Sequence, residues 1–360
     1  MKEGWTYKYF EDCLVKAAKA KQVQTSEYNS GSKYPIISQE DKMVSGYCDD
    51  DSLLYHIDNP VVIFGDHTRV LKYVDFDFVV GADGVKILIP KEFLKAKFLL
   101  YYLRWYQVPS LGYSRHYKLL KEIVLPVPPI AEQERIVAEL DLLSGIIEKK
   151  KEQLKAYDQL AQSIFYTMFG DLLEANPTKN LKDVASYYIG LTYKPTDVSE
   201  QGTIVLRSSN IQNNILDFND IVRVNLNVGE NKTVKDGDIL MCARNGSARL
   251  VGKVARIRNI NEKMSFGAFM TIIRSEYNDF LFHFFLSDFF RSQLTTSKTA
   301  TINQITSRML DNIKLNVPPL SLQQEFAEKV EAIERQKALV QQSIEETQTM
   351  FDCTMDKYFG

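Results

Sequence analysis

The sequence has no long hydrophobic run, few cysteines and almost no net charge. No stretch of 18 or more residues is continuously apolar, which argues against a membrane span, and the first residues (MKEGWTYKYFEDCL) contain no apolar segment typical of a secretory signal. The cysteines are scattered, without a C-x-x-C pair, at Cys13, Cys48, Cys242 and Cys353. We therefore expect neither a structural zinc site nor a disulfide framework, and the composition favours a reducing cytoplasm. A net charge of −2 neither indicates nor excludes a nucleic-acid partner.

Motifs of the obvious enzyme classes are also missing. A methyltransferase needs a cofactor loop such as F-x-G-x-G and an N/D-P-P-Y/F site, whereas both Pro-Pro pairs here follow valine, and no Walker loop occurs. The histidines show no spacing typical of metal ligands; they are His56, His67, His116 and His283. Asp66-His67 with Asp75 and Asp77 could be interpreted as a nuclease cluster, but loose acidic residues on strands are common. We predict no catalytic residue and no metal site, and we expect His283, within FLFHFFL, to be packed in a core or against a partner.

A repeat organises the chain. Residues 117–170 and 307–360 align without a gap at an offset of 190 residues, and both segments contain V-P-P-[IL] followed by a glutamine and end in Phe-Gly. At roughly 150 residues per domain, 360 residues predict two or three domains, and 45% hydrophobic residues suffice for packed cores. The repeat therefore predicts a pseudo-twofold chain with four parts: 1–117, 118–172, 173–307 and 308–360.

Each copy of the repeat predicts a short strand, a Pro-Pro pair and then a long helix. Proline is tolerated at the start of a helix and disfavours helix before it, and about 40 proline-free residues follow. Apolar residues recur in steps of three, four and seven, which is typical of a coiled coil. The simplest partner for each apolar stripe is the other copy. We expect helix and subunit packing through Leu140, Ile147, Leu154, Ile164, Val330, Ile344 and Phe351.

The long helices are acidic, with net charges of −3 over 130–171 and −4 over 320–360. The lysine run at 148–155 could contact DNA, but a solvated helix face is the more common role of such a run. We therefore interpret the helices as spacers or protein-docking surfaces.

Both parts that precede a long helix read as mixed α/β units. In the first, strands are predicted at Tyr34–Ser38, Val61–Phe64, Val70–Val80 and Val85–Ile89, with a helix over 91–106. In the second, strands are predicted at Ile204–Arg207, Asp238–Cys242, Val251–Ile257 and Ala268–Arg274, with a helix over 278–294. The order of elements recurs while the residues diverge, which suggests two modules of one fold that recognise different targets.

Basic and polar residues gather in the predicted loops. The region 191–308 has a net charge of +4, and its loops contain RSSN at 207–210 and RNGSAR at 244–249. The first unit has DHTR at 66–69 and YSRHYK at 113–118. Arg, Asn and Ser on loops suit phosphate contacts and base readout, although the same residues also favour ordinary turns. The predicted DNA contacts are His67, Arg69, Arg115, His116, Lys118, Arg207, Asn210, Arg244, Asn245, Ser247 and Arg249.

These residues carry a family resemblance over the whole chain. The two V-P-P-[IL]-x-x-Q helix entries, with DILMCARNGSARLVGK, FGAFM and TINQIT in the second unit and VVIFGDHTRV and SRHYKLLKEIVLPVPPIAEQERI in the first, resemble the specificity (S) subunits of type I restriction–modification systems. The resemblance implies two target recognition domains that each read half of a bipartite DNA site. It also implies two antiparallel coiled-coil helices that separate the domains, set the spacer and dock two methyltransferase (M) subunits, with restriction (R) subunits recruited to the complex.

The resemblance further implies a chain that is not itself catalytic and binds no cofactor, with S-adenosylmethionine, ATP and magnesium held by the partner subunits. Two alternatives stay open at this point. The chain could be a two-module coiled-coil scaffold that binds protein or RNA, which its near-neutral charge permits. It could also be an inactive or antagonist relative of the S subunits with the same fold.

Overall fold

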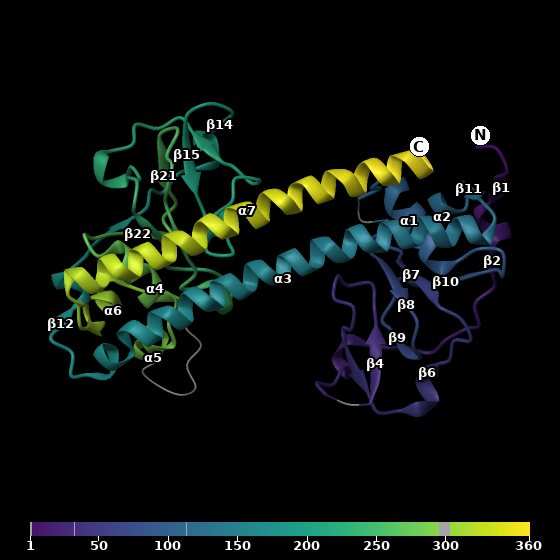
Figure 1. Cartoon of the computed structure of the whole chain (residues 1–360), viewed down its shortest axis with the longest axis horizontal. Helices are drawn as coiled ribbons and strands as arrows, with labels where there is room; N and C mark the ends of the chain where they lie inside the picture. The colour runs from purple at the N-terminus through teal and green to yellow at the C-terminus, as the bar shows by residue number, and fades with distance from the viewer. Residues whose placement is uncertain (1, 32, 113, 295–302) are drawn as a thin grey trace. The chain divides into compact units, whose positions relative to one another are not determined.

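The computed structural model describes residues 2–31, 33–112, 114–294 and 303–360. Tyr113 of YSRHYK and Thr301 and Ile302 of TINQIT lie outside the described residues. The chain forms two compact units, shown in Figure 1. Unit 1 combines Met1–Glu152 with Gln341–Gly360, and unit 2 is the continuous segment Gln153–Val340. Each unit therefore contains a globular domain and part of both long helices, whereas the predicted boundaries placed each helix in a part of its own.

The two long helices form as predicted, α3 over Ile130–Glu174 and α7 over Leu320–Phe359. Both begin just after their Pro-Pro pair, and the repeated glutamine explains why this entry recurs. The Gln133 side-chain amide donates to the carbonyl of Pro128 at 2.8 Å, and the Gln323 amide donates to the carbonyl of Pro318 at 2.7 Å. The glutamine thus binds a carbonyl of the turn that leads into its own helix, so the motif fixes the entry of the chain in both copies.

The helices pack antiparallel within each unit. In unit 1, the Lys150 ammonium donates to the Thr347 hydroxyl at 3.1 Å. In unit 2, the Lys337 ammonium pairs with Asp158 at 2.7 Å. Of the predicted packing residues, four are buried, namely Leu140, Ile147, Val330 and Ile344. The other three are half-buried, namely Leu154, Ile164 and Phe351. Lys150 faces the partner helix, so the lysine run is not uniformly a solvated face.

Unit 1 contains two main sheets. The first is antiparallel, in the order β2-β10-β7-β8, and consists of β2 (Leu14–Val15), β10 (Val85–Pro90), β7 (Val61–Gly65) and β8 (Leu71–Val74). The second contains β3 (Gln22–Val23), β9 (Phe78–Gly81), β4 (Tyr34–Ile37) and β5 (Gly46–Cys48), with β6 (Leu54–Tyr55) also paired to β9. Strands β4 and β9 are parallel. The predicted strand over 70–80 is therefore two strands, β8 and β9, that belong to different sheets.

Unit 2 repeats this arrangement. Its antiparallel sheet has the order β13-β22-β19-β20 and consists of β13 (Ser186–Ile189), β22 (Met270–Arg274), β19 (Ile239–Cys242) and β20 (Val254–Arg256). Its second sheet contains β14 (Val198–Ser199), β18 (Arg223–Val224), β15 (Thr203–Leu206) and β21 (Met264–Phe266), and β16 (Ile211–Gln212) and β17 (Ile215–Leu216) form a hairpin. Strands β15 and β21 are parallel, as β4 and β9 are in unit 1.

A short strand pair closes each domain beside the helix entry. Strand β1 (Thr6–Tyr9) pairs with β11 (Val124–Val127), and β12 (Lys179–Asn180) pairs with β23 (Lys314–Leu315), both antiparallel. Short helices precede β11 and β23, namely α2 (Tyr117–Leu120) and α6 (Ser307–Asp311). The pseudo-twofold repeat thus extends through the globular domains, where the sequences have diverged.

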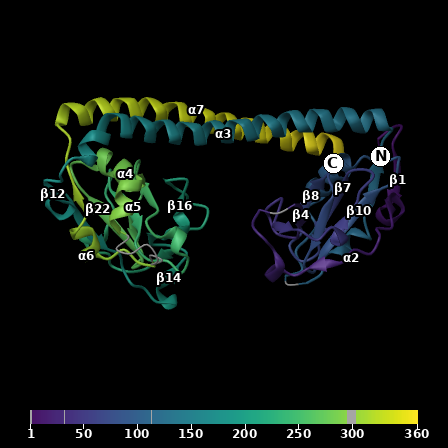
Figure 2. The ribbon, with the colours of Figure 1, turned by 90° about the horizontal axis from the view of Figure 1, so that it is seen from below.

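Aromatic side chains join each domain to its portion of the long helices. In unit 1, α1 (Ala96–Tyr106) packs on α7, with the Phe98 and Phe359 rings 5.4 Å apart. In unit 2, α4 (Asn278–Leu286) lies next to the paired long helices (Figure 2), and the Phe280 ring is 5.2 Å from that of Phe169. His283 is buried in this cluster, as the sequence predicted, 5.0 Å from the ring of Phe326.

Two helices differ from the predicted bounds for identifiable reasons. The helix predicted over 91–106 begins at 96 because the Lys95 amide donates to the buried Gln133 side chain at 2.8 Å instead of to a helical carbonyl. The helix predicted over 278–294 is divided into α4 and α5 (Asp288–Leu294) at Ser287. The Ser287 hydroxyl donates to the Phe284 carbonyl at 2.6 Å and accepts from the Phe290 amide at 3.3 Å, so it ends one helix and caps the next.

Candidate nucleic-acid interface

Four loops of unit 2 meet at one end of its sheets. They follow β15, follow β19, precede β22 and precede α6, and we call residues 207–210, 243–249, 267–269 and 303–306 the second loop cluster. Ala243 lies at its centre, because its amide donates to the Phe269 carbonyl at 2.9 Å and its carbonyl accepts from the Ile305 amide at 2.7 Å. The Asn245 side chain donates to the Ser208 hydroxyl at 3.0 Å. These bonds bring the two basic loops predicted in this unit together.

Unit 1 brings the equivalent loops together through equivalent bonds. We call residues 38–40, 65–70, 83–84, 110–112 and 114–118 the first loop cluster. The Asp66 amide donates to the Gly84 carbonyl at 2.7 Å, and the Asp66 carbonyl accepts from the His116 amide at 2.8 Å. The His67 amide donates to the Gln39 side chain at 3.2 Å. Asp66 thus occupies the place of Ala243, and the two units present the same loops with different residues.

The exposed residues of the second loop cluster include basic and polar side chains. Arg244, Ser247 and Arg249 are exposed, and the Arg244 guanidinium lies 5.4 Å from the centre of the Phe269 ring. Asn245 is half-buried. Its side-chain oxygen accepts from the Ser247 amide at 2.9 Å, which holds the loop in a tight turn. This surface can supply guanidinium groups to phosphates or base edges.

Arg207 and Asn210 are more committed to the protein itself. The Arg207 guanidinium pairs with Asp220 at 2.6 Å, and about a third of its side chain is exposed. Asn210 is fully buried; its oxygen accepts from the Arg207 amide, and its nitrogen donates to the carbonyls of Asp217 at 2.9 Å and Asp220 at 3.0 Å. We therefore expect Asn210 to shape the loop and not to contact a base.

The first loop cluster contains the five candidates of unit 1 in different environments. Arg115 and Lys118 are exposed, and His67 is half-buried. Arg69 has a positive φ of 63°, and its guanidinium donates to the Val108 carbonyl at 3.0 Å. His116 is buried, with one ring nitrogen 2.9 Å from the Asp66 carbonyl and the other accepting from the Leu111 amide at 2.9 Å. Both of its nitrogens are used inside the domain, so we expect His116 to orient the loop and not to read DNA.

The predicted DNA contacts are all charged or polar residues, and they do not include Phe269. This side chain is 59% exposed, which is unusual for phenylalanine. It lies in the loop between β21 and β22, within the second loop cluster. It carries no charge, and FGAFM also reads as the start of a buried strand. An apolar residue directly after Gly-Ala at a turn was the only signal in the sequence that could have indicated it.

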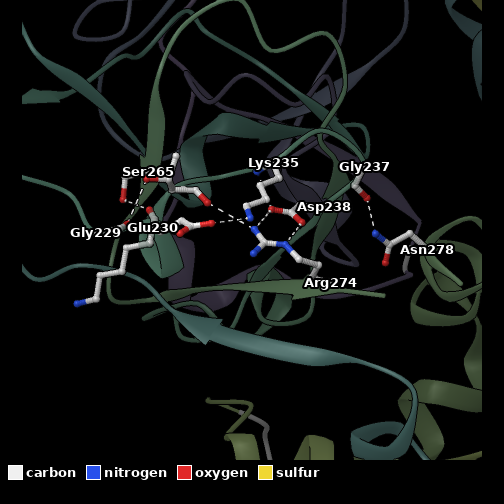
Figure 3. A network of polar contacts seen from close by, with 10 residues as sticks. Gly229, Glu230, Lys235, Gly237, Asp238, Ser265, Arg274 and Asn278 are labelled. Carbon is white, nitrogen blue, oxygen red and sulfur yellow. Dashed lines mark hydrogen bonds and ion pairs between the residues drawn. The ribbon is translucent and has the colours of Figure 1, made fainter. Parts of the chain in front are cut away.

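A buried ion pair stiffens the strands that carry this cluster. Asp238 precedes β19 and Arg274 ends β22, so the pair joins the ends of these strands that lie opposite to the loops. Figure 3 shows Arg274 directed at Asp238, with two nitrogen–oxygen distances of 2.7 and 2.6 Å. The Asp238 side chain is almost fully buried and also accepts from the Lys235 amide at 2.8 Å. The hydrogen bonds that Arg274 donates to Asp238 raise the pKa of Arg274 above its ordinary value, which keeps the guanidinium charged.

Membrane-spanning helices and metal-ligand groups are both absent from the described ranges. No helix there combines the length and the apolar character needed to cross a membrane. No group of three or more His, Cys, Asp or Glu side chains in those same ranges is placed to hold a metal ion.

Comparison with known proteins agrees with the geometry. Residues 2–156 and 174–348 match the family described as type I restriction modification DNA specificity domain, and the chain therefore belongs to this family. The resemblance stated from the helix entries is thus confirmed, and each match covers one globular domain with a large part of a long helix. The mixed α/β class with two domains and two long helices is confirmed as well.

Individual relatives give the same family. The chain is 31% identical over 173 residues to the specificity subunit of the type I restriction enzyme EcoKI of Escherichia coli (strain K12), which covers 46% of this chain and 37% of that protein. It is 26% identical over 242 residues to the MjaVIII specificity subunit of Methanocaldococcus jannaschii, covering 60% and 56%. The match therefore spans only about 37% of the first of these relatives and just over half of the second.

Solved structures show the same fold. The S subunit of a type I restriction–modification system from M. genitalium superposes with a TM-score of 0.53 at 14% identity, covering 99% of this chain and 96% of that one. A chain from a structure concerned with complex assembly and conformational transition of the type I R-M system has a TM-score of 0.50 at 16% identity, covering 99% and 98%. At such low identity, the likeness is one of fold.

Proposed function

We propose that the chain is the DNA-sequence-specificity subunit of a type I restriction–modification complex. The observation that carries the proposal is the pair of equivalent loop clusters. Both units have the same arrangement of strands and bring equivalent loops together, but the side chains of these loops differ. Each cluster would read one half of a bipartite DNA site, and the chain itself would catalyse no reaction. Family membership supports this assignment, because the matching domain is described as a DNA specificity domain.

Within each cluster the residues divide by role. Arg244 and Arg249 in unit 2, and Arg115 and Lys118 in unit 1, are exposed cations suited to phosphates and base edges. The remaining candidates would contact base edges or hold the shape of their loop. They are His67, Arg69, Arg207, Asn245 and Ser247. His116 and Asn210 would position the loops from within.

The partners in this proposal are double-stranded DNA, two M subunits docked on the long helices, and R subunits. The long helices would also set the spacer between the half-sites, because α3 and α7 both run without interruption from one compact unit into the other. S-adenosylmethionine, ATP and magnesium would belong to the partner subunits, and the complex would work in the cytoplasm. The acidic character of both helices suits protein docking better than DNA contact.

The proposal is tested by co-expressing this chain with the methyltransferase subunit encoded nearest to its gene and sequencing the host DNA with single-molecule detection of methyladenine. We expect an asymmetric bipartite motif that disappears when this chain is omitted. A stable complex without a new motif would indicate an inactive or antagonist relative. If neither a complex nor a motif were found, the result would favour the alternative of a scaffold that binds protein or RNA.

Phe269 and Arg249 should affect DNA binding in different ways. We expect Phe269→Ala to weaken binding of a duplex with the cognate motif about tenfold, or about 1.4 kcal/mol, without changing the salt dependence, because an aromatic contact releases no counterion. Arg249→Ala should lower the slope of log affinity against log salt by about 0.9, as expected for one lost phosphate contact. Fluorescence anisotropy of the assembled complex at several salt concentrations measures both quantities.

Val198→Ala provides the control for Phe269→Ala. Val198 is also an exposed apolar residue of unit 2, in strand β14, outside the second loop cluster. We expect this variant to bind like the unchanged chain. Equal losses of affinity for the two variants would mean that Phe269 acts through general folding and not through DNA.

A further inference from the structure

Unit 1 contains a groove beside the first loop cluster, and none of the predicted DNA contacts lies in its wall. The groove has a volume of about 560 Å³, and residues 14–20 and 85–87 supply most of its wall. These residues belong to β2 with the segment that follows it, and to the first half of β10. Tyr117 of the first loop cluster also lines the groove. The groove is therefore continuous with the surface that we propose to read DNA.

The groove exists because β2 is short. Strand β2 pairs only with Ile89 and Pro90, so among the described residues 85–88 pair with β7 alone. The chain after β2 reads KAAKA, and lysine and alanine are depleted in strands, which explains why the pairing ends there. In unit 2, β13 pairs with residues 271–274 of the equivalent strand β22. The open strand edge is therefore a feature of unit 1 that unit 2 does not share.

Two lysines at the groove already have a counter-charge. The Lys86 ammonium lies 3.6 Å from the Asp66 carboxylate, and the Lys121 ammonium lies 2.6 Å from that of Glu11. Both lysines also lie over the Tyr117 ring, at 5.5 and 5.6 Å from its centre. These contacts hold Tyr117 at the boundary between the groove and the first loop cluster, and they add no net charge.

Lys16 and Lys19 have no such counter-charge. Both line the groove and are exposed, and neither has an ion-pair partner within the described ranges. The carboxylates nearest to the wall in sequence, Asp12 and Asp83, do not line it. The adjoining residues 114–118 add further exposed cations. The groove and its surroundings therefore keep a positive excess at a surface that solvent and a large ligand can reach.

This surface suits phosphates better than base edges. An ammonium group on a flexible stem binds a phosphate as a point charge, whereas base readout needs the directed donors and acceptors of residues such as Arg and Asn, which KAAKA lacks. Alternate residues of the segment 85–88 direct their backbone N–H groups away from β7, and backbone N–H groups also bind phosphates. The small alanine side chains let a DNA strand approach closely.

We propose that this groove binds the sugar–phosphate backbone of DNA next to the bases that the first loop cluster reads. The inference rests on the proposed function, and it adds a contact surface outside the loops. Lys16 and Lys19 would each neutralise a phosphate, which fixes the position of unit 1 on the duplex without reading sequence. No equivalent contact is expected in unit 2, where β13 covers the corresponding strand edge.

The test replaces Lys16 and Lys19 together by glutamine, in the chain assembled with its M subunits. Fluorescence anisotropy with a duplex that carries the methylated motif gives the slope of log affinity against log salt. We expect this slope to fall by about 1.8, because each lost phosphate contact removes about 0.9. The methylated motif itself should stay the same. Hydroxyl-radical footprinting should show lost protection only beside the half-site that Arg115→Ala alters.

Two further variants serve as controls. Lys33→Gln with Lys179→Gln removes the same amount of charge from exposed lysines outside the groove, one before β4 and one in β12, and should leave the slope unchanged. Replacing Lys16 and Lys19 by arginine keeps both charges and should also keep the slope. An unchanged slope in the glutamine variant, or an equal fall in the Lys33 and Lys179 control, would refute the proposal.

The remaining outcomes separate this inference from the proposed function. If the glutamine variant lost an M subunit while its salt dependence stayed the same, the groove would bind protein and the proposal would be wrong. A changed methylation motif would show that the lysines read bases, which also contradicts it. If the unchanged complex bound DNA normally and only the expected fall in slope were missing, this inference alone would fail. If the unchanged complex bound no duplex at all, the proposed function would fail with it.

Discussion

Replacing Asp238 by alanine should lower the free energy of unfolding of unit 2 by about 3–5 kcal/mol. The substitution removes the carboxylate that receives two bonds from Arg274 and one from the Lys235 amide. It leaves the Arg274 guanidinium, three-quarters buried, without its counter-charge. Such a loss is much larger than that of an exposed pair, because the remaining charge cannot be hydrated in place.

Hydrogen exchange measured by mass spectrometry, with denaturant, locates this effect. We expect faster exchange in peptides from β19 and β22 and unchanged exchange in peptides from β7 and β10, the equivalent strands of unit 1. The matched control is Glu262→Ala, which breaks the half-exposed Arg223–Glu262 pair at 2.7 Å and should lower the free energy of unfolding far less, because solvent screens this pair. Similar effects of the two substitutions would show that the Asp238 pair does not stabilise the strands that carry the loops.

Substituting Arg244 and Asn245 together should change one half of the methylated DNA motif and leave the other half intact. These residues belong to the second loop cluster alone, and each good base contact contributes about 1–3 kcal/mol of discrimination. Loss of both contacts should therefore reduce selectivity at the affected positions by roughly tenfold or more. Single-molecule sequencing of DNA methylated by the assembled complex gives both half-sites from one sample.

Arg115→Ala in the first loop cluster is the reciprocal control. It is an exposed arginine of the first loop cluster, in the loop before α2, and it should alter the other half-site only. If either variant relaxed both half-sites together, the two units would not read DNA independently, and the proposal of one half-site per unit would be wrong.

The long helices could be predicted from the sequence because their signals are local. A proline-free stretch with an apolar period needs no knowledge of the rest of the chain, and the Gln133 and Gln323 motifs mark where each helix begins. The division at Ser287 could not be predicted, because a serine side chain that bonds a carbonyl in the same turn looks like any exposed helical serine. Strand order was equally hidden, since the pairing of β10 with β7 joins segments about twenty residues apart.

The sequence indicated which loops would form the candidate site, but not which of their side chains face outward. Residue type separates polar from apolar, yet Asn210 and His116 are polar residues that serve the fold, and Phe269 is an apolar residue that faces outward. The difference depends on which loops meet, and that depends on contacts such as the Ile305 amide to the Ala243 carbonyl. The roles of the arginines in these loops stay predictions.

The division of unit 1 between both ends of the chain has a consequence during synthesis. Phe359 packs on Phe98 and Tyr102, so part of the aromatic face of α1 is covered by residues made after unit 2. At about 5–20 residues per second, the ribosome needs roughly 10–40 s to pass from residue 152 to residue 341. Unit 2, which is continuous, can fold within that time. Unit 1 therefore begins to emerge before unit 2 and is completed after it, so we expect part of its aromatic surface to stay uncovered during the interval.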